Sequence, residues 1–136
     1  MSFRWLAWLP VLLSANAFAT GYPVEIFEYV DSTRVVAFIN PSDVDETHYW
    51  HPFKEVPPLT IEKVAASIHQ YVSSDAELKD ATLEEIELRK LPHFEKQWHY
   101  MVKMRTEHDH QIKNRYFVVL MNGNVIPAIQ EPQSIK

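Results

Sequence analysis

One amphipathic helical pattern, with strand patterns on both sides of it, most strongly limits how this chain can fold. Apolar side chains recur at helical spacing on a single face, at Ile61, Val64, Ala65, Ile68 and Val72. Thr60 precedes them as an N-cap residue, and the polar run 73–75 ends the pattern. The pattern predicts one helix of about 14 residues, with an apolar face that another element must cover.

Two strand patterns precede this helix. Residues 24–30 and 34–39 are rich in β-branched and aromatic side chains, and the polar residues 31–33 separate them. This arrangement is typical of a β-hairpin. Pro41 ends the second strand, because proline cannot donate a hydrogen bond to the ladder.

Further strand patterns follow the helix. Residues 82–91 alternate between apolar and charged side chains. Residues 97–107 alternate more strictly, with one apolar face and a second face that we expect to be solvated. The apolar face carries Trp98, Tyr100, Val102 and Met104, and the solvated face carries His99, Lys103, Arg105 and Glu107.

The last strands are predicted near the end of the chain. Residues 115–121 are continuously apolar after Arg115, which is typical of a strand buried on both faces. Asn122-Gly123 favours a type I′ hairpin turn, and residues 125–128 form a short returning strand. Pro127 places that strand at a sheet edge.

The order of these elements predicts the α+β class. The simplest packing lays the single helix across the concave face of a twisted antiparallel sheet of four to six strands, with an N-terminal β-hairpin.

The second half of the chain resembles a known group of domains. The helix is followed by the strand Trp98-His99-Tyr100-Met101-Val102, and a later apolar strand at 116–120 leads into Asn122-Gly123-Asn124-Val125-Ile126. On these motifs, residues 60–128 resemble the PepSY and cystatin-like small exported domains. Met121-Asn122 stands where that group usually has an acidic residue before the turn. The resemblance implies a binding or inhibitory role, often toward peptides or proteases.

The first 19 residues have the pattern of a cleavable signal peptide. One positive charge at Arg4 precedes the apolar run 5–13, and the small residues Ala17 and Ala19 fit a cleavage site. The apolar run is about half the length of a membrane-spanning helix, which needs roughly 20 residues. We therefore expect cleavage after Ala19, a single domain at residues 20–136, a periplasmic or secreted location, and no stable membrane insertion afterwards.

Composition excludes several classes of function. The chain has no cysteine, which rules out disulfides, thiol catalysis and a lipid-modified N-terminal cysteine. Its formal net charge of −5 becomes one unit more negative once Arg4 is removed, which argues against nucleic acid and anionic lipid as partners. Two glycines leave no phosphate-cradling loop, so we expect no nucleotide ligand.

The irregular segment 44–58 is the first candidate for binding. It carries Tyr49, Trp50 and Phe53 and is closed by Pro57-Pro58. Long loops in small domains are often functional, and aromatic residues on a rigid loop make good interface anchors. The competing interpretation is that the segment closes the core at one end of the sheet. An open sheet edge, to which an extended peptide can add, is a second candidate.

Histidine pairs offer an alternative role. His108 and His110 flank Asp109 in a polar connection, and they would point to the same side if that stretch were extended. His48 and His51 form a second pair in the aromatic segment. Such imidazole pairs can hold Zn²⁺ or Cu²⁺, although metal sites usually have three or four ligands.

Catalysis is the third hypothesis. None of the serines lies in a nucleophile elbow, and Glu85 and Glu87 fall on the outward face of a strand, where carboxylates keep ordinary acidity. The sequence therefore favours a non-enzymatic exported binding or accessory domain without a cofactor. Its expected partner is a protein or peptide, and the alternative is a periplasmic metal-binding protein.

Overall fold

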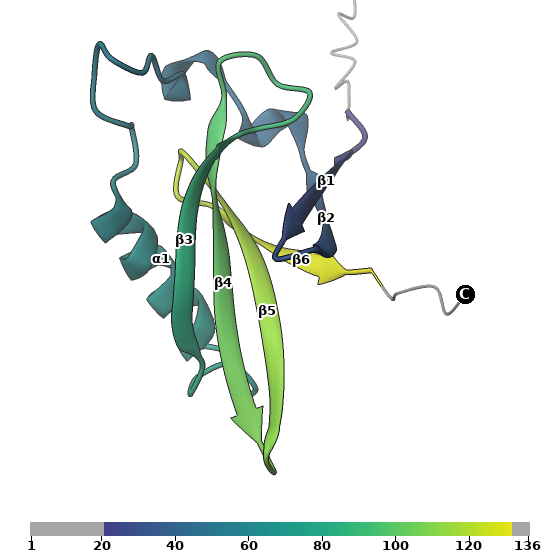
Figure 1. Cartoon of the computed structure of the whole chain (residues 1–136). Coiled ribbons are helices and arrows are strands. Elements are labelled where there is room, and N and C mark those ends of the chain that lie inside the picture. The colour runs from purple at the N-terminus through teal and green to yellow at the C-terminus, as the bar shows by residue number, and fades with distance from the viewer. Residues whose placement is uncertain (1–20, 132–136) are drawn as a thin grey trace, which may run out of the picture.

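The computed structural model describes residues 21–131, so the expected signal peptide at residues 1–19 lies outside the described residues. The predicted α+β class is confirmed, with one α-helix and six strands in this part of the chain (Figure 1). The elements are β1 (Val24–Val30), β2 (Thr33–Ile39), η1 (Pro41–Asp43), η2 (Glu46–His48), α1 (Ile61–Ser73), β3 (Thr82–Lys90), β4 (Trp98–His108), β5 (Gln111–Leu120) and β6 (Val125–Gln130).

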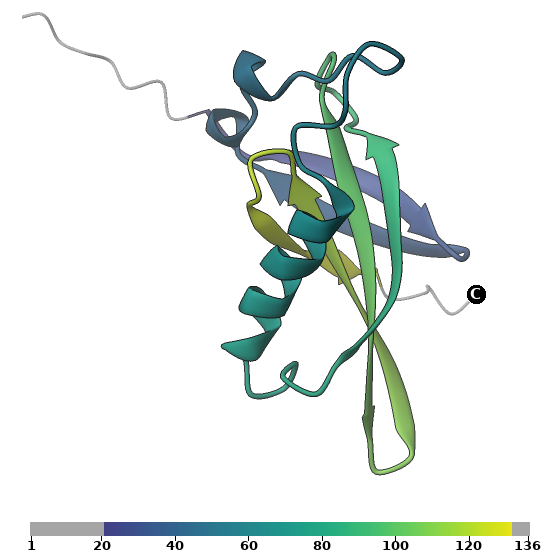
Figure 2. The same cartoon turned by 90° about the vertical axis from the view of Figure 1, so that its left-hand side faces the viewer.

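The six strands form one antiparallel sheet in the order β1-β2-β6-β5-β4-β3. β2 pairs with β6 at two positions, Val35 with Gln130 and Val36 with Ile129. The sheet turns at this short junction, so β1 and β2 cross the face of β4 and β5 that lies opposite α1 (Figure 2). The fold therefore has the helix on one side of the long strands and the β1–β2 pair on the other.

β5 contributes to both cores, as its continuous apolar sequence predicts. Phe117 and Val119 face the helix, whereas Tyr116, Val118 and Leu120 face β1 and β2. All five side chains are buried. A strand covered on both faces needs no polar side of its own, which explains why this stretch does not alternate.

The predicted helix is confirmed as α1. Val64, Ile68 and Val72 are buried against the sheet, and burial of each such side chain contributes roughly 1.5–3 kcal/mol. Ile61, the first residue of the predicted apolar stripe, is exposed. Thr60 occupies the N-cap position with extended backbone angles, but its side chain makes no capping hydrogen bond.

The prediction that the second face of β4 is solvated was wrong for the first half of the strand. His99 and Met101 are buried because β1 and β2 cover them, and Lys103 is largely covered. The Nε2 atom of His99 lies 2.8 Å from Oε1 of the buried Glu28 on β1. His99 is thus an interior residue and not the surface residue that the alternation indicates.

The predictions for the last turn and strand also need correction. β6 lies between β2 and β5, not at an edge. Pro127 is tolerated because it pairs with Phe117 of β5 at a point that β2 does not reach. The β5–β6 connection is not the predicted two-residue type I′ turn, since Asn122 does not have a positive φ and Gly123 does, at 91°.

Candidate functional site

The segment between β2 and α1 meets the β3–β4 connection at one end of the sheet. Trp50 donates its backbone N–H to the carbonyl of Lys96 at 3.3 Å, and Gln97 donates its side-chain N–H to the carbonyl of Asp45 at 2.6 Å. The rings of Trp50 and Trp98 pack edge to face, with centroids 4.9 Å apart and planes 76° apart. These contacts hold the β2–α1 segment and the β3–β4 connection, which are far apart in the sequence, against each other.

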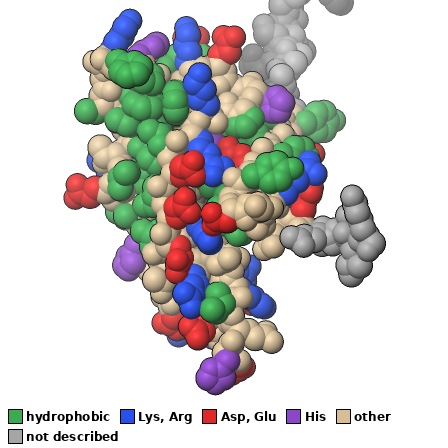
Figure 3. Space-filling model, viewed as in Figure 1, with side chains coloured by type: hydrophobic (Ala, Val, Ile, Leu, Met, Phe, Trp, Pro, Cys, Tyr) green, Lys and Arg blue, Asp and Glu red, His purple; other side chains and the backbone are tan. Residues whose placement is uncertain are grey.

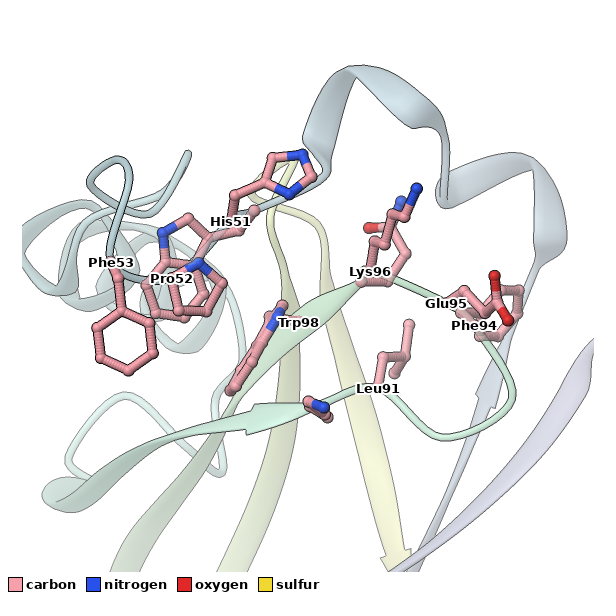
Figure 4. A pocket seen from close by; sticks show the side chains of 11 residues that line it. His51, Pro52, Phe53, Leu91, Phe94, Glu95, Lys96 and Trp98 are labelled. Atoms are coloured by element: carbon pink, nitrogen blue, oxygen red, sulfur yellow. The ribbon is translucent and has the colours of Figure 1, made fainter.

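A cavity of about 550 Å³ opens between these two segments (Figure 4). This volume is within the usual range of ligand sites. Most of its walls are apolar side chains, namely Trp50, Pro52, Phe53, Leu91, Phe94 and Trp98. Its polar lining residues are His51, Lys90, Glu95, Lys96 and Gln97.

The loop beside the cavity is braced from within. Trp50 donates its indole N–H to the carbonyl of Glu55 at 2.9 Å, and the backbone N–H of His51 donates to the Glu55 carboxylate at 3.0 Å. The backbone N–H of Lys54 donates to the carbonyl of His51 at 3.2 Å. Together with Pro52 and the following Pro57 and Pro58, these bonds fix the loop, which we call the aromatic loop (residues 50–56).

The aromatic loop turns apolar side chains outward. Phe53 has a relative exposure of 108% and Val56 of 78%. Figure 3 shows hydrophobic side chains gathered at the upper left of the molecule, where the segment between β2 and α1 reaches the surface. Exposed apolar side chains on a fixed loop are a common feature of protein interaction sites.

Backbone strain concentrates in the same two segments. Seven non-glycine residues among those described have a positive φ, and four of them occupy the two-residue turns Asp31-Ser32 and Asp109-His110. Such turns require that conformation. The other three are Phe53, His93 and Lys96, at 72°, 67° and 57°. All three lie in the segments that form the cavity, and strained backbone in folded proteins clusters at functional sites.

Asp45 stabilises the short helix η2, which leads into the aromatic loop. Hydrogen bonds from the side chains of Thr47 and His48 hold the pKa of the Asp45 carboxyl below its usual value. Asp45 is also the N-cap of η2, where its side chain accepts the backbone N–H of Thr47. The short helix η2 is therefore fixed at both its cap and its last residue, ahead of Tyr49 and Trp50.

The structure brings together part of the predicted binding set. Trp50 and Phe53 line the cavity, whereas Tyr49 does not line it and instead packs its ring beneath Lys96 Nζ at 5.7 Å. Sequence reasoning missed Trp98, Leu91 and Phe94, which complete the apolar wall. Trp98 packs against the helix-side core, as its place on the apolar face of β4 predicts. As the first residue of β4 it also lies at the end of the sheet, beside the cavity.

The histidine pairs take different positions. His108 ends β4, and Asp109 and His110 form the turn with left-handed backbone, so the extended arrangement that would align His108 with His110 is not present. His48 Nδ1 lies 2.8 Å from Asp45 Oδ1, while His51 lines the cavity. Among residues 21–131, no three His, Cys, Asp or Glu side chains are grouped so that they could hold a metal ion.

Comparison with protein family models, curated proteins and solved structures finds no match for this chain. The function must therefore be inferred from the geometry of the aromatic loop and its cavity. Within the described residues no helix is long and apolar enough to cross a membrane.

Proposed function

We propose that this chain is an exported binding domain that engages a protein or peptide partner through the aromatic loop and the adjacent cavity. The observation that carries the proposal is Phe53, a bulky apolar residue that is fully exposed and held at a positive φ. Left-handed backbone costs a non-glycine residue about 1–2 kcal/mol. Because the ring is exposed, no burial of apolar surface offsets this strain. Contact of the ring with a partner would explain both its exposure and its strained backbone.

The brace around Phe53 supports the same proposal. A loop that is already fixed loses little conformational entropy when it binds, so more of the contact energy becomes affinity. The internal bonds of Trp50 and Glu55 supply this preorganisation. The neighbouring cavity offers a matching recess for an apolar side chain of the partner.

Export is part of the proposal and rests on the leader pattern in residues 1–19. An accessory or inhibitor-like role would agree with the resemblance to PepSY and cystatin-like domains. The chain would act outside the cytoplasm, where the absence of cysteine makes its stability independent of redox conditions.

Site-specific photocrosslinking tests the binding surface. The full chain, produced in its own cells, would carry a benzophenone amino acid in place of Phe53, or in place of Ile112 as a control with 56% relative exposure on β5. We expect a discrete adduct from position 53 and not from position 112. Equal crosslinking at both positions would remove the aromatic loop from the proposal.

The same cells test export. The mass of the protein in the exported fraction should correspond to a chain that begins at Thr20. Recovery of the uncut 136-residue chain in the cytoplasm would contradict this part of the proposal.

A further inference from the structure

Two lysines line the otherwise largely apolar cavity. Lys90, at the end of β3, places its Nζ atom 5.8 Å from the ring centroid of Trp98. Lys96 approaches Tyr49 from the β3–β4 connection, at a similar distance. Within residues 21–131 neither ammonium group forms an ion pair with a carboxylate. Each therefore keeps its charge available to a ligand.

Fewer carboxylates than lysines line the cavity. Glu55, whose carboxylate accepts the backbone N–H of His51, is not among the residues that line the cavity. Glu95 lies at the rim beside Phe94, on the side away from Phe53 and Pro52 (Figure 4). The lining of the cavity thus carries two lysines against one carboxylate, in a protein whose formal net charge is −5. This local reversal of charge favours an anionic ligand group.

We propose that the cavity binds the C-terminal residue of a peptide or protein. Its free carboxylate would pair with Lys90 and Lys96, and its apolar side chain would lie against Trp50 and Trp98. A C-terminal residue carries a carboxylate and a side chain on one Cα, which matches a cavity lined by two lysines and by apolar side chains. This inference rests on the proposed function and adds the chemical class of the segment that is bound.

The two tryptophans provide a direct measurement. Trp50 and Trp98 are the only tryptophans in residues 20–136, and both line the cavity, so tryptophan fluorescence of the mature chain reports on this site. The mature chain would be titrated with the acetylated tripeptide Gly-Pro-Phe as its free acid and as its C-terminal amide. We expect the acid to bind about tenfold more tightly, the effect of two partly exposed ion pairs.

Lysine variants test whether the preference for the peptide acid over its amide depends on the cavity. Lys90→Met and Lys96→Met should each reduce the preference for the acid to about threefold, because each removes one of two pairs. Lys79→Met, at an exposed position in the turn after α1, should leave the preference unchanged. Retention of the full preference in both cavity variants would overturn the proposal.

The remaining outcomes separate this inference from the proposed function. Equal binding of acid and amide, or binding of neither while the adduct at position 53 forms, would overturn the C-terminal carboxylate and leave the binding surface in place. Decanoate bound as tightly as the peptide acid would overturn a peptide ligand in favour of a fatty acid. Peptide-acid binding without an adduct at position 53 would support the cavity and contradict the role of the aromatic loop.

Discussion

His99 on β4 and Glu28 on β1 meet in the interior, with Nε2 and Oε1 2.8 Å apart and relative side-chain exposures of 0% and 7%. The distance is that of an ion pair, yet neither ring nitrogen of His99 has a well-directed hydrogen bond within the described residues. The two polar groups lie this close in the low-dielectric interior, where their electrostatic interaction is stronger than it would be in water. The contact joins the β1–β2 pair to the long strands.

Arg89 of β3 completes this buried cluster. Its guanidinium lies 3.4 Å from the Glu28 carboxylate, donates to the carbonyl of Tyr29 at 2.9 Å, and pairs with Glu87 at 2.6 Å. Burial lowers the pKa of Arg89, but the hydrogen bond and charge of Glu87 and the charge of Glu28 outweigh it and raise the pKa above its usual value. Arg89 is therefore the cation that balances the buried Glu28.

Replacement of Arg89 should destabilise the fold strongly. Arg89→Met leaves the Glu28 carboxylate buried without its cation, which costs about 3–5 kcal/mol. Urea unfolding would measure the loss, and Arg34→Met, which removes an exposed pair with Glu131, should cost less than about 1 kcal/mol. Glu28→Gln added to Arg89→Met should recover part of the loss. Strictly additive losses in the double variant would show that the two groups are not coupled.

The elements of the fold could be predicted from sequence because each has its own local pattern. The 3.6-residue period from Val64 to Val72 marks α1, and the continuous apolar run that ends at Met121 marks a strand buried on both faces. No local sequence pattern indicates that β1 and β2 cover the second face of β4. The alternation separates His99 from Trp98, but only the path of β1 and β2 decides whether the side of His99 is solvated.

Only some residues of the candidate site could be predicted from the sequence. Trp50 and Phe53 stand out because they lie on a proline-framed loop in one short stretch of sequence. Trp98 joins them only through the packing of a strand end against that loop, and a strand pattern does not reveal which residue lies at the end of the sheet. The positive φ of Phe53 could not be predicted either, because the residues that usually mark such a conformation are glycine and asparagine, and neither stands at this position.

Tyr100 should make the fold sensitive to alkaline pH. Its buried hydroxyl donates to the carbonyl of Leu59, and burial raises the pKa of Tyr100. A pKa raised in the folded state gives stability that is complete below the unfolded value of about 10 and is lost as pH rises through the folded value. Tyr100→Phe should cost about 1–3 kcal/mol at pH 8, because the Leu59 carbonyl loses its donor.

Urea unfolding between pH 8 and pH 11 checks this prediction. The difference between the native chain and Tyr100→Phe should narrow at the upper end of the range. Tyr29→Phe removes an exposed hydroxyl and should leave the pH profile unchanged. A difference that stays constant up to pH 11 would contradict the role of Tyr100.

The turn between β4 and β5 should gain stability from glycine. His110 has φ 64° in a two-residue turn, a position that favours glycine. His110→Gly should stabilise the fold by about 1 kcal/mol, since the left-handed backbone is then unstrained. His108→Gly, at the last position of β4, should instead destabilise it by about 0.5–1 kcal/mol. Thermal unfolding of the two variants gives opposite shifts if the turn has this conformation.

Phe53 should show a conflict between stability and binding. Its ring is fully exposed and its φ is 72°, so Phe53→Gly removes strain without the loss of a buried side chain and should stabilise the fold by about 1 kcal/mol. Phe53→Ala keeps a Cβ atom in the same strained backbone, so its unfolding midpoint in urea should stay close to that of the native chain. Both variants should lose the adduct formed by a benzophenone probe at Val56, because both lack the ring. A stabilised glycine variant that still forms this adduct would show that Phe53 is strained for a reason other than binding.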